Sequence, residues 1–424
     1  MKTTSCAAYK RMGRRDFLTI GGTGLFGLTM SGFLQPQARA GSKASGKAKN
    51  MILIWLSGGP PHIDMFDMKP DAPADYRGEF KPIQTNVPGM EICELMPRLA
   101  KIADKYTIMR SCSIGNESFE HSGGNYWLTG NPRRATPKFP SYGSVISKVR
   151  PTEAALPTFV NLNGYGGSLD DSYLGSAFAP LRFLPDPKSE VRNMLMPQID
   201  VPSLERREDL FRNINKQLQE QDALSSVIAG LDETRQKGFD LLRSPKLREA
   251  MDLTREPIQS AQRYGKGDLG QRVLVARRLV EAGIPCVWLN NDGWDFHGGN
   301  FTGCRSKLPE VDAALSALLA DLDARGLLET TIVAMLGEMG RTPKIGLPKT
   351  VAGREHWGTT QFVFVAGGGF KGGTIVGATD KIAAFVTDKK YKVESFGRTL
   401  YHLVGIDADR ELLTTTNRPM KISL

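Results

Sequence analysis

The 424-residue chain contains little cysteine and little histidine, with five residues of each. No two cysteines are closely spaced, which excludes a zinc finger and a Cys-x-x-Cys redox motif. Long lysine and arginine runs interleaved with aromatic residues are also missing, so we expect no nucleic-acid partner. What the chain does have is 40% hydrophobic residues, enough for one large domain or two smaller ones.

The first forty residues have the features of an export signal. The twin arginines Arg14-Arg15 precede DFL and a weakly apolar run rich in Gly and Thr, and a small-residue ARA pattern ends at Ala40. This predicts a twin-arginine signal over residues 1–40, cleaved after Ala40, and therefore a periplasmic or secreted protein that meets the twin-arginine export machinery. The alternative is an amphipathic first helix or a membrane anchor, but a stable membrane span after cleavage is not expected. Cleavage lowers the formal net charge from +10 to +5.

After a linker over 41–50, strand patterns alternate with helix patterns, which predicts an α/β fold: a doubly wound, mostly parallel sheet with helices on both faces. We assign a single domain to 51–424, with a charged helical insertion at about 201–264. Strands are expected at 51–57, 106–111, 156–162, 284–290, 330–336 and 361–367, and helices at 95–105, 125–128, 142–149, 268–282, 308–325 and 393–404.

Histidines and carboxylates gather where the predicted strands end. In open parallel sheets, ligands bind beyond the carboxyl ends of the strands. Four of the five histidines lie in such loops beside carboxylates, while the fifth, His402, lies in a helical pattern and is expected to be a core or surface residue. The residues in these loops are His62, Asp64 and Asp67; Glu120, His121 and Ser122; Asp292, Asp295 and His297; Glu338 and Arg341; and Arg354, Glu355 and His356.

Two interpretations of these loops compete. A single aspartate at a strand end is commonly a turn former, whereas a mixed set of aspartate, glutamate and histidine at one sheet edge suits a divalent metal such as Zn or Mn, with Ca or Mg as alternatives. Asp295 and His297 flank Phe296, so in an extended turn both can point the same way. Asp292 precedes a glycine at a turn and is interpreted as a turn former.

The sequence resembles a known bacterial family at this point. The segments LSGGPPHIDMFD, GGNYWLTGNP, LGEMGRTPKIG and GREHWGTTQFVFVAGGGF occur in this order and are similar to exported, sulfatase-like proteins of unassigned function in the alkaline phosphatase superfamily. The resemblance covers nearly the whole mature chain, and GEMGRTP and GREHWG are its most specific motifs. It implies a doubly wound sheet and a one- or two-metal site at which a Ser, Thr or Cys-derived nucleophile attacks phosphate or sulfate esters.

The resemblance implies a metal-ligand set, residue by residue. Asp295 and His297 match a GWD-x-H pattern, and His356 stands at the terminal metal histidine. Glu338 stands where the superfamily has an aspartate, although Met339 follows it where a histidine is expected. The first strand ends in Ser-Gly-Gly instead of the usual aspartate, and the nearest carboxylate is that of Asp64.

The nucleophile is less clearly implied. Counting back from a Thr-Gly pair, as in sulfatases and phosphatases, leads to Glu120, which is followed by His121 and Ser122. No Cys-x-Pro-x-Arg sequence is present, so a formylglycine is not supported. The alternatives are that Ser122 attacks, that His121 takes part, or that a metal-activated water does. Arg341, or else Arg354, would neutralise the developing charge; the competing interpretation of Arg341 is a salt-bridged loop residue.

Two functions therefore remain. The first is an exported metal-dependent hydrolase of phosphate or sulfate esters, whose anionic substrate would be a sulfated or phosphorylated polysaccharide. The second is a catalytically degenerate sulfatase-like protein with a binding or structural role at the cell surface. Asp295, His297 and His356 favour the enzyme, whereas Met339 and the uncertain nucleophile favour the degenerate member.

Overall fold

The structure is a computed structural model that describes residues 46–115, 123–132, 137–150, 156–162, 172–183, 244–346 and 352–424. The predicted signal at 1–40, His121 and Ser122, and residues 201–243 of the predicted insertion lie outside the described residues. Within that part of the chain, no helix is both long and apolar enough to cross a membrane.

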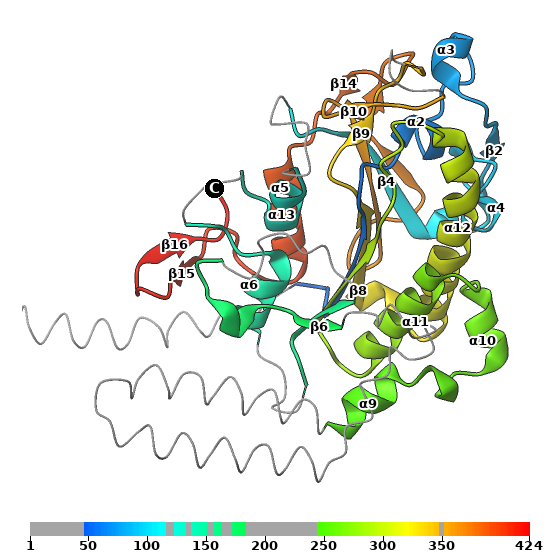
Figure 1. The fold of residues 1–424 in the computed structure, drawn as a ribbon. Helices are drawn as coiled ribbons and strands as arrows, with labels where there is room; N and C mark the ends of the chain where they lie inside the picture. The colour runs from blue at the N-terminus through cyan, green and yellow to red at the C-terminus, as the bar shows by residue number, and fades with distance from the viewer. Residues whose placement is uncertain are drawn as a thin grey trace, which may run out of the picture. The chain divides into compact units, whose positions relative to one another are not determined.

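A mostly parallel central sheet organises the unit formed by residues 46–424 (Figure 1). Of its eight described strands, only β11 runs antiparallel to its neighbours β4 and β8. The predicted α/β sheet is therefore confirmed. In spatial order the strands are β12 (Thr374–Val376), β4 (Tyr106–Cys112), β11 (Gln361–Ala366), β8 (Thr331–Leu336), β1 (Asn50–Leu56), β7 (Cys286–Asn291), β5 (Phe159–Leu162) and β6 (Leu181–Phe183).

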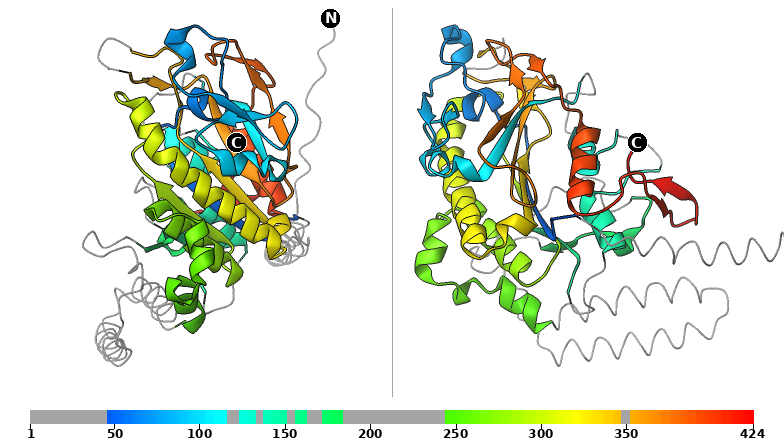
Figure 2. Two further views of the ribbon diagram at one scale, coloured as in Figure 1. Left: turned by 90° about the vertical axis from the view of Figure 1, so that its right-hand side faces the viewer. Right: turned by 180° about the vertical axis from the view of Figure 1, so that it is seen from behind.

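Helices cover both faces of the sheet, as predicted (Figure 2). Successive side chains of a strand point to opposite faces, and in β1 the alternate residues Ile52 and Ile54 join one apolar cluster while Leu53 and Trp55 join the other. The first cluster includes residues of α4 (Pro97–Ala100), α11 (Asp268–Glu281) and α12 (Asn300–Ala324). The second includes residues of α5 (Gly123–Thr129), α6 (Tyr142–Val149) and α13 (Val393–Leu403).

Two helices differ from their predicted bounds by more than two residues. The helix expected over 95–105 is broken into α4 and a 3₁₀ turn at Ala103–Lys105. The helix expected from Leu308 instead begins at Asn300, because buried Phe301, Cys304 and Leu308 continue the apolar stripe toward the N-terminus. Pro309 lies inside this helix, so the packing of that stripe offsets the usual cost of an interior proline.

The described part of the predicted insertion is helical. It contains α9 (Pro245–Met251), a 3₁₀ turn at Leu253–Arg255 and α10 (Ile258–Arg263). A buried ion network attaches this segment to helix α11. Glu256 pairs with Arg277 at 2.6 Å and with Arg278 at 2.9 Å, and both arginines lie on α11. The segment is therefore packed against the main fold at its C-terminal end.

Short paired strands outside the central sheet complete the described elements. The pair that matters for function is β9 (Gly340–Arg341) with β10 (His356–Trp357), an antiparallel ribbon in which His356 lies opposite Arg341. The others are β2 (Pro82–Gln84) with β3 (Glu91–Cys93), β13 (Ala378–Thr379) with β14 (Val386–Asp388), and β15 (Glu411–Leu413) with β16 (Pro419–Lys421).

The four described cysteines are buried and unpaired. Burial raises the pKa of Cys93 to about 12 and raises the pKa values of Cys112, Cys286 and Cys304 as well. Because the thiolate is the reactive and metal-binding form, these four side chains act as core residues.

Candidate metal centre

Asp295 and His297 are presented by the loop that joins β7 to α12. Two aromatic side chains of this loop are buried: Trp294, whose indole N–H donates to Asn291 Oδ1 at 2.7 Å, and Phe296. The Trp294 backbone N–H also donates to the Ser57 carbonyl at the end of β1 (3.0 Å). The polar residues between and after these anchors keep about two-fifths of their side-chain surface exposed, 42% for Asp295 and 41% for His297.

His356 arrives from a different part of the chain, on β10. Its side chain is 20% exposed. The antiparallel pairing with β9 places His356 opposite Arg341. Next to this pair, the Thr342 N–H donates to the Glu355 carbonyl at 2.8 Å and extends the ribbon by one residue on each strand. The ribbon therefore brings a histidine from 59 residues further along the sequence to the loop of His297.

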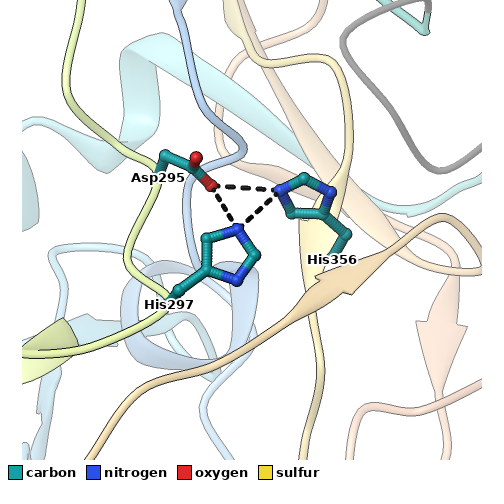
Figure 3. Close-up of side chains that lie close together, drawn as sticks. All are labelled: Asp295, His297 and His356. Atoms are coloured by element: carbon teal, nitrogen blue, oxygen red, sulfur yellow. Dashed lines mark hydrogen bonds and ion pairs between the residues drawn. The ribbon is translucent and has the colours of Figure 1, made fainter. Parts of the chain in front are cut away.

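The three side chains converge on one point (Figure 3). Asp295 Oδ1 lies 3.0 Å from His297 Nε2 and 3.0 Å from His356 Nε2, and the two Nε2 atoms are 3.1 Å apart. Bond lengths of about 2.0–2.1 Å in a tetrahedral zinc site put the donor atoms about 3.3 Å from one another. Two imidazole nitrogens and one carboxylate oxygen at nearly this spacing fit a divalent transition metal.

Arg341 holds Asp295 in the ionised form. Burial of the carboxylate opposes ionisation, but hydrogen bonds from Arg341 and His356 outweigh it and lower the pKa of Asp295 to about 2. The carboxylate is therefore negative over the whole ordinary pH range, as a metal ligand must be.

Arg341 is paired with Asp295 and lies behind the cluster. Its side chain is fully buried, and its guanidinium donates to the carbonyls of Gly59 (2.8 Å), Arg354 (3.1 Å) and Trp294 (3.2 Å), as well as to the Gly58 carbonyl and Asp295. These contacts join the end of β1, the Asp295 loop and the segment before His356. They fit a salt-bridged loop residue that positions the cluster, and neutralisation of developing charge by Arg341 stays a prediction.

Asp64 is not brought to the cluster. Its carboxylate is buried and receives two hydrogen bonds from Arg354, at 2.7 Å and 3.0 Å, and one from the Asn300 amide at 2.8 Å. Both oxygens accept from protein partners, so Asp64 lies apart from the three converging side chains, and its role as a metal ligand stays a prediction. The same pairing buries Arg354 completely, which also removes it as a group that could bind a substrate anion.

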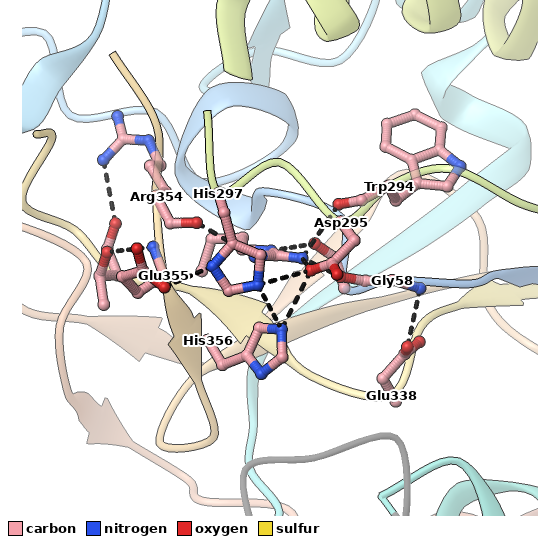
Figure 4. Close-up of polar contacts among 11 residues, drawn as sticks. Gly58, Trp294, Asp295, His297, Glu338, Arg354, Glu355 and His356 are labelled. Atoms are coloured by element: carbon pink, nitrogen blue, oxygen red, sulfur yellow. Dashed lines mark hydrogen bonds and ion pairs between the residues drawn. The ribbon is translucent and has the colours of Figure 1, made fainter. Parts of the chain in front are cut away.

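Glu338 also lies apart from the three converging side chains (Figure 4). It follows β8, is buried, and accepts a hydrogen bond from the Gly58 N–H at 2.7 Å. Gly58 has a φ of +116°, in the region that favours glycine. Glu338 therefore secures the turn after β1, and its role as a metal ligand stays a prediction.

Glu355 is a residue at this site that the sequence placed in a strand-end loop but to which it gave no role. Its carboxylate contacts His297 Nδ1 on the side of the ring away from the cluster (Figure 4). The available signal was the carboxylate directly before His356 in the GREHWG motif. His121 and Ser122, the residues predicted to take part in the chemical step, lie outside the described residues.

Comparison with known proteins shows which family the chain belongs to. No curated protein matches the sequence. Similar solved structures include the lipoteichoic acid synthase LtaP from Listeria monocytogenes, at 9% identity and a TM-score of 0.40, covering 90% of this chain and 76% of that one. Two others are 12% identical with a TM-score of 0.36: the PsFucS1 sulfatase from Pseudoalteromonas sp. (89% and 71% covered) and alkaline phosphatase from the Antarctic bacterium TAB5 (85% and 99%). Residues 48–423 match the model of a family described as "Protein of unknown function (DUF1501)", and the chain belongs to that family.

Proposed function

We propose that this chain is an exported, metal-dependent hydrolase of phosphate or sulfate esters. The observation that carries the proposal is the convergence of Asp295, His297 and His356 within 3.1 Å of one another. One carboxylate and two imidazoles suit Zn or Mn better than Ca or Mg, which prefer oxygen ligands. The resemblance of the GEMGRTP and GREHWG motifs to sulfatase-like proteins supports ester hydrolysis over other metal chemistry.

The charges around the cluster favour an anionic substrate. A divalent ion at such a site acts as a Lewis acid that stabilises charge developing on an ester oxygen. Asp295, Glu355 and Arg341 together carry one formal negative charge, so a divalent ion leaves this group with one net positive charge. The exposed surface of Asp295 and His297 leaves the cluster accessible from solvent.

The nucleophile and the export route are part of the same proposal. We retain Ser122 and His121 as the groups to test, with an activated water as the alternative. The signal at 1–40, cleaved after Ala40, makes the protein periplasmic or secreted. The exported chain then consists of one domain at 51–424 with a helical insertion at about 201–264. Sulfated or phosphorylated polysaccharides are then the substrates proposed.

A binding or structural protein is the second candidate, and specific observations favour it. Met339 is fully buried where a histidine is expected, and two predicted ligands, Asp64 and Glu338, are bonded elsewhere. A degenerate member would keep the Asp295 cluster without turning over an ester.

Metal analysis and an activity screen separate the two candidates. The purified mature protein would be assayed for bound Zn and Mn and screened against aryl phosphate and aryl sulfate esters. We expect one divalent ion per chain and turnover that His297→Ala and His356→Ala abolish, while His402→Ala, an exposed histidine on α13, retains both. Bound metal without turnover would favour the second candidate, and absence of metal binding would overturn the hydrolase.

A further inference from the structure

We propose that Glu355 is a positioning residue that orients the His297 ring through its Nδ1 atom and thereby directs His297 Nε2 to the cation. The proposal rests on the metal centre described under the proposed function. Glu355 Oε2 contacts His297 Nδ1, on the opposite side of the ring from the Nε2 atom that faces Asp295 and His356. The two ring nitrogens of His297 therefore have different partners.

The Glu355 carboxylate is held by a rigid main chain. The Glu355 N–H donates to Thr342 Oγ1 at 2.9 Å, and the Thr342 N–H donates to the Glu355 carbonyl at 2.8 Å. The next residue, His356, belongs to the β9–β10 ribbon. The same strand pairing thus fixes the backbone of both Glu355 and His356. The carboxylate and the second histidine are therefore positioned together.

Hydrogen-bond chemistry gives the contact its consequence. When Nε2 of a neutral histidine binds a cation, the ring proton is on Nδ1, and a carboxylate beside Nδ1 can accept it. His297 Nε2 points at Asp295 Oδ1 and His356 Nε2, where a metal ligand atom is needed. Carboxylate partners of this kind orient metal-binding histidines, and their loss costs about 10–100-fold in metal affinity.

His62 provides an internal contrast. It is buried, burial lowers its pKa, and its Nε2 lies 2.9 Å from the Ala383 carbonyl. A carbonyl also only accepts, so the neutral His62 ring carries its proton on Nε2. With a cation on His297 Nε2, His62 and His297 are therefore expected to be opposite tautomers in one protein, which makes His62 a reference for an NMR measurement.

Two measurements test the role of Glu355. Zinc affinity would be measured by competition with a chromogenic chelator for the wild type, Glu355→Ala, Glu355→Gln and the control Glu249→Ala, which removes an exposed carboxylate on α9. We expect about 10–100-fold weaker binding for Glu355→Ala. A smaller loss is expected for Glu355→Gln, whose amide oxygen still accepts from Nδ1–H, and no change for the control. Glu355→Gln also preserves side-chain shape if the alanine variant does not fold.

Long-range ¹H–¹⁵N spectra of the zinc-loaded protein report which ring nitrogen carries the proton. We expect His297 to be protonated at Nδ1 and His62 at Nε2, and Glu355→Ala to shift the His297 Nδ1–H signal, which loses its acceptor, while the His62 signal stays unchanged. Wild-type zinc affinity and an unchanged His297 spectrum in Glu355→Ala would overturn the role of Glu355 and leave the proposed function standing. A wild type that binds neither zinc nor manganese would overturn both.

Discussion

Two aspartate–arginine pairs lie beside each other in this fold and have opposite properties. Asp64 and Arg354 are both buried, and Asp64 uses both carboxylate oxygens on protein donors. Asp295 is 42% exposed, and one of its oxygens contacts buried Arg341 and two histidine nitrogens. The two arginines are themselves linked, since Arg341 donates to the Arg354 carbonyl at 3.1 Å.

The difference shows what makes a carboxylate available for chemistry. Arginine keeps each aspartate in place, but Asp295 also contacts two imidazoles directly and is partly open to solvent, whereas Asp64 is buried. Both carboxylate oxygens of Asp64 accept hydrogen bonds at 2.7–3.0 Å, so a cation would compete with the guanidinium and the Asn300 amide. The residue type and its position at a strand end are therefore not enough to predict a metal ligand. The hydrogen-bond partners and the solvent exposure of the carboxylate decide its role.

Breaking the buried Asp64–Arg354 pair should have the largest effect on stability. Asp64→Ala leaves the Arg354 guanidinium buried without its carboxylate, and removing one partner of a buried ion pair costs about 3–5 kcal/mol. Urea unfolding monitored by tryptophan fluorescence would measure this loss. The milder Asp64→Asn should keep zinc affinity at the wild-type value; a folded Asp64→Asn protein that no longer binds zinc would make Asp64 a ligand and contradict the comparison.

Changing the partly exposed Asp295–Arg341 pair should affect metal binding more than folding. Asp295→Ala removes a ligand atom, so zinc affinity should fall by more than the roughly 100-fold upper limit for a residue behind the ligands. Chelator competition would measure the change, with Asp292→Ala, the neighbouring turn aspartate, as the matched control. Equal zinc affinity for the wild type and Asp295→Ala would show that the cluster is not a metal site.

Metal removal should destabilise the protein only through the loss of the ion bound at Asp295, His297 and His356. Free zinc at about 100 times its Kd stabilises the folded state by about 2.7 kcal/mol. The increase in the free energy of unfolding should disappear with EDTA, persist in Asp64→Asn and be absent from His297→Ala. A zinc-dependent increase of the same size in His297→Ala would place the ion elsewhere.

A pair on the surface should show the smallest effect. Glu249 and Arg255 are each more than half exposed and lie 3.0 Å apart. Solvent screens such pairs, so Glu249→Ala should change the free energy of unfolding by about 0–1 kcal/mol. Urea unfolding under the conditions used for Asp64→Ala would measure it, and a loss as large as that of Asp64→Ala would remove burial as the cause of the difference.

Much of the fold was predictable from local patterns. Runs such as MILIWL and TIVAML are continuously apolar because their strands are buried on both faces, and this signal survives without knowledge of neighbours. The antiparallel direction of β11 was not predictable, since its sequence QFVFVA is equally apolar whichever way it runs. The early start of α12 was also missed, because Pro309 interrupts the pattern that a helix normally shows.

The candidate site was predictable in part for a similar reason. Asp295 and His297 are two residues apart, so their proximity is a local property, and His356 follows a recognisable motif. Asp64 and Glu338 looked equivalent to them because both follow strands. Their partners lie 290 and 280 residues away in the sequence, at Arg354 and Gly58, and no local pattern reports such a distance.

The sequence by itself determined which residue types could reach the carboxyl edge of the sheet, because strand periodicity and loop composition are local. Only the tertiary structure decided which carboxylates remained available there. Asp64 and Asp295 differ in the charges, donors and solvent that surround them, and those surroundings exist only after distant segments have packed together.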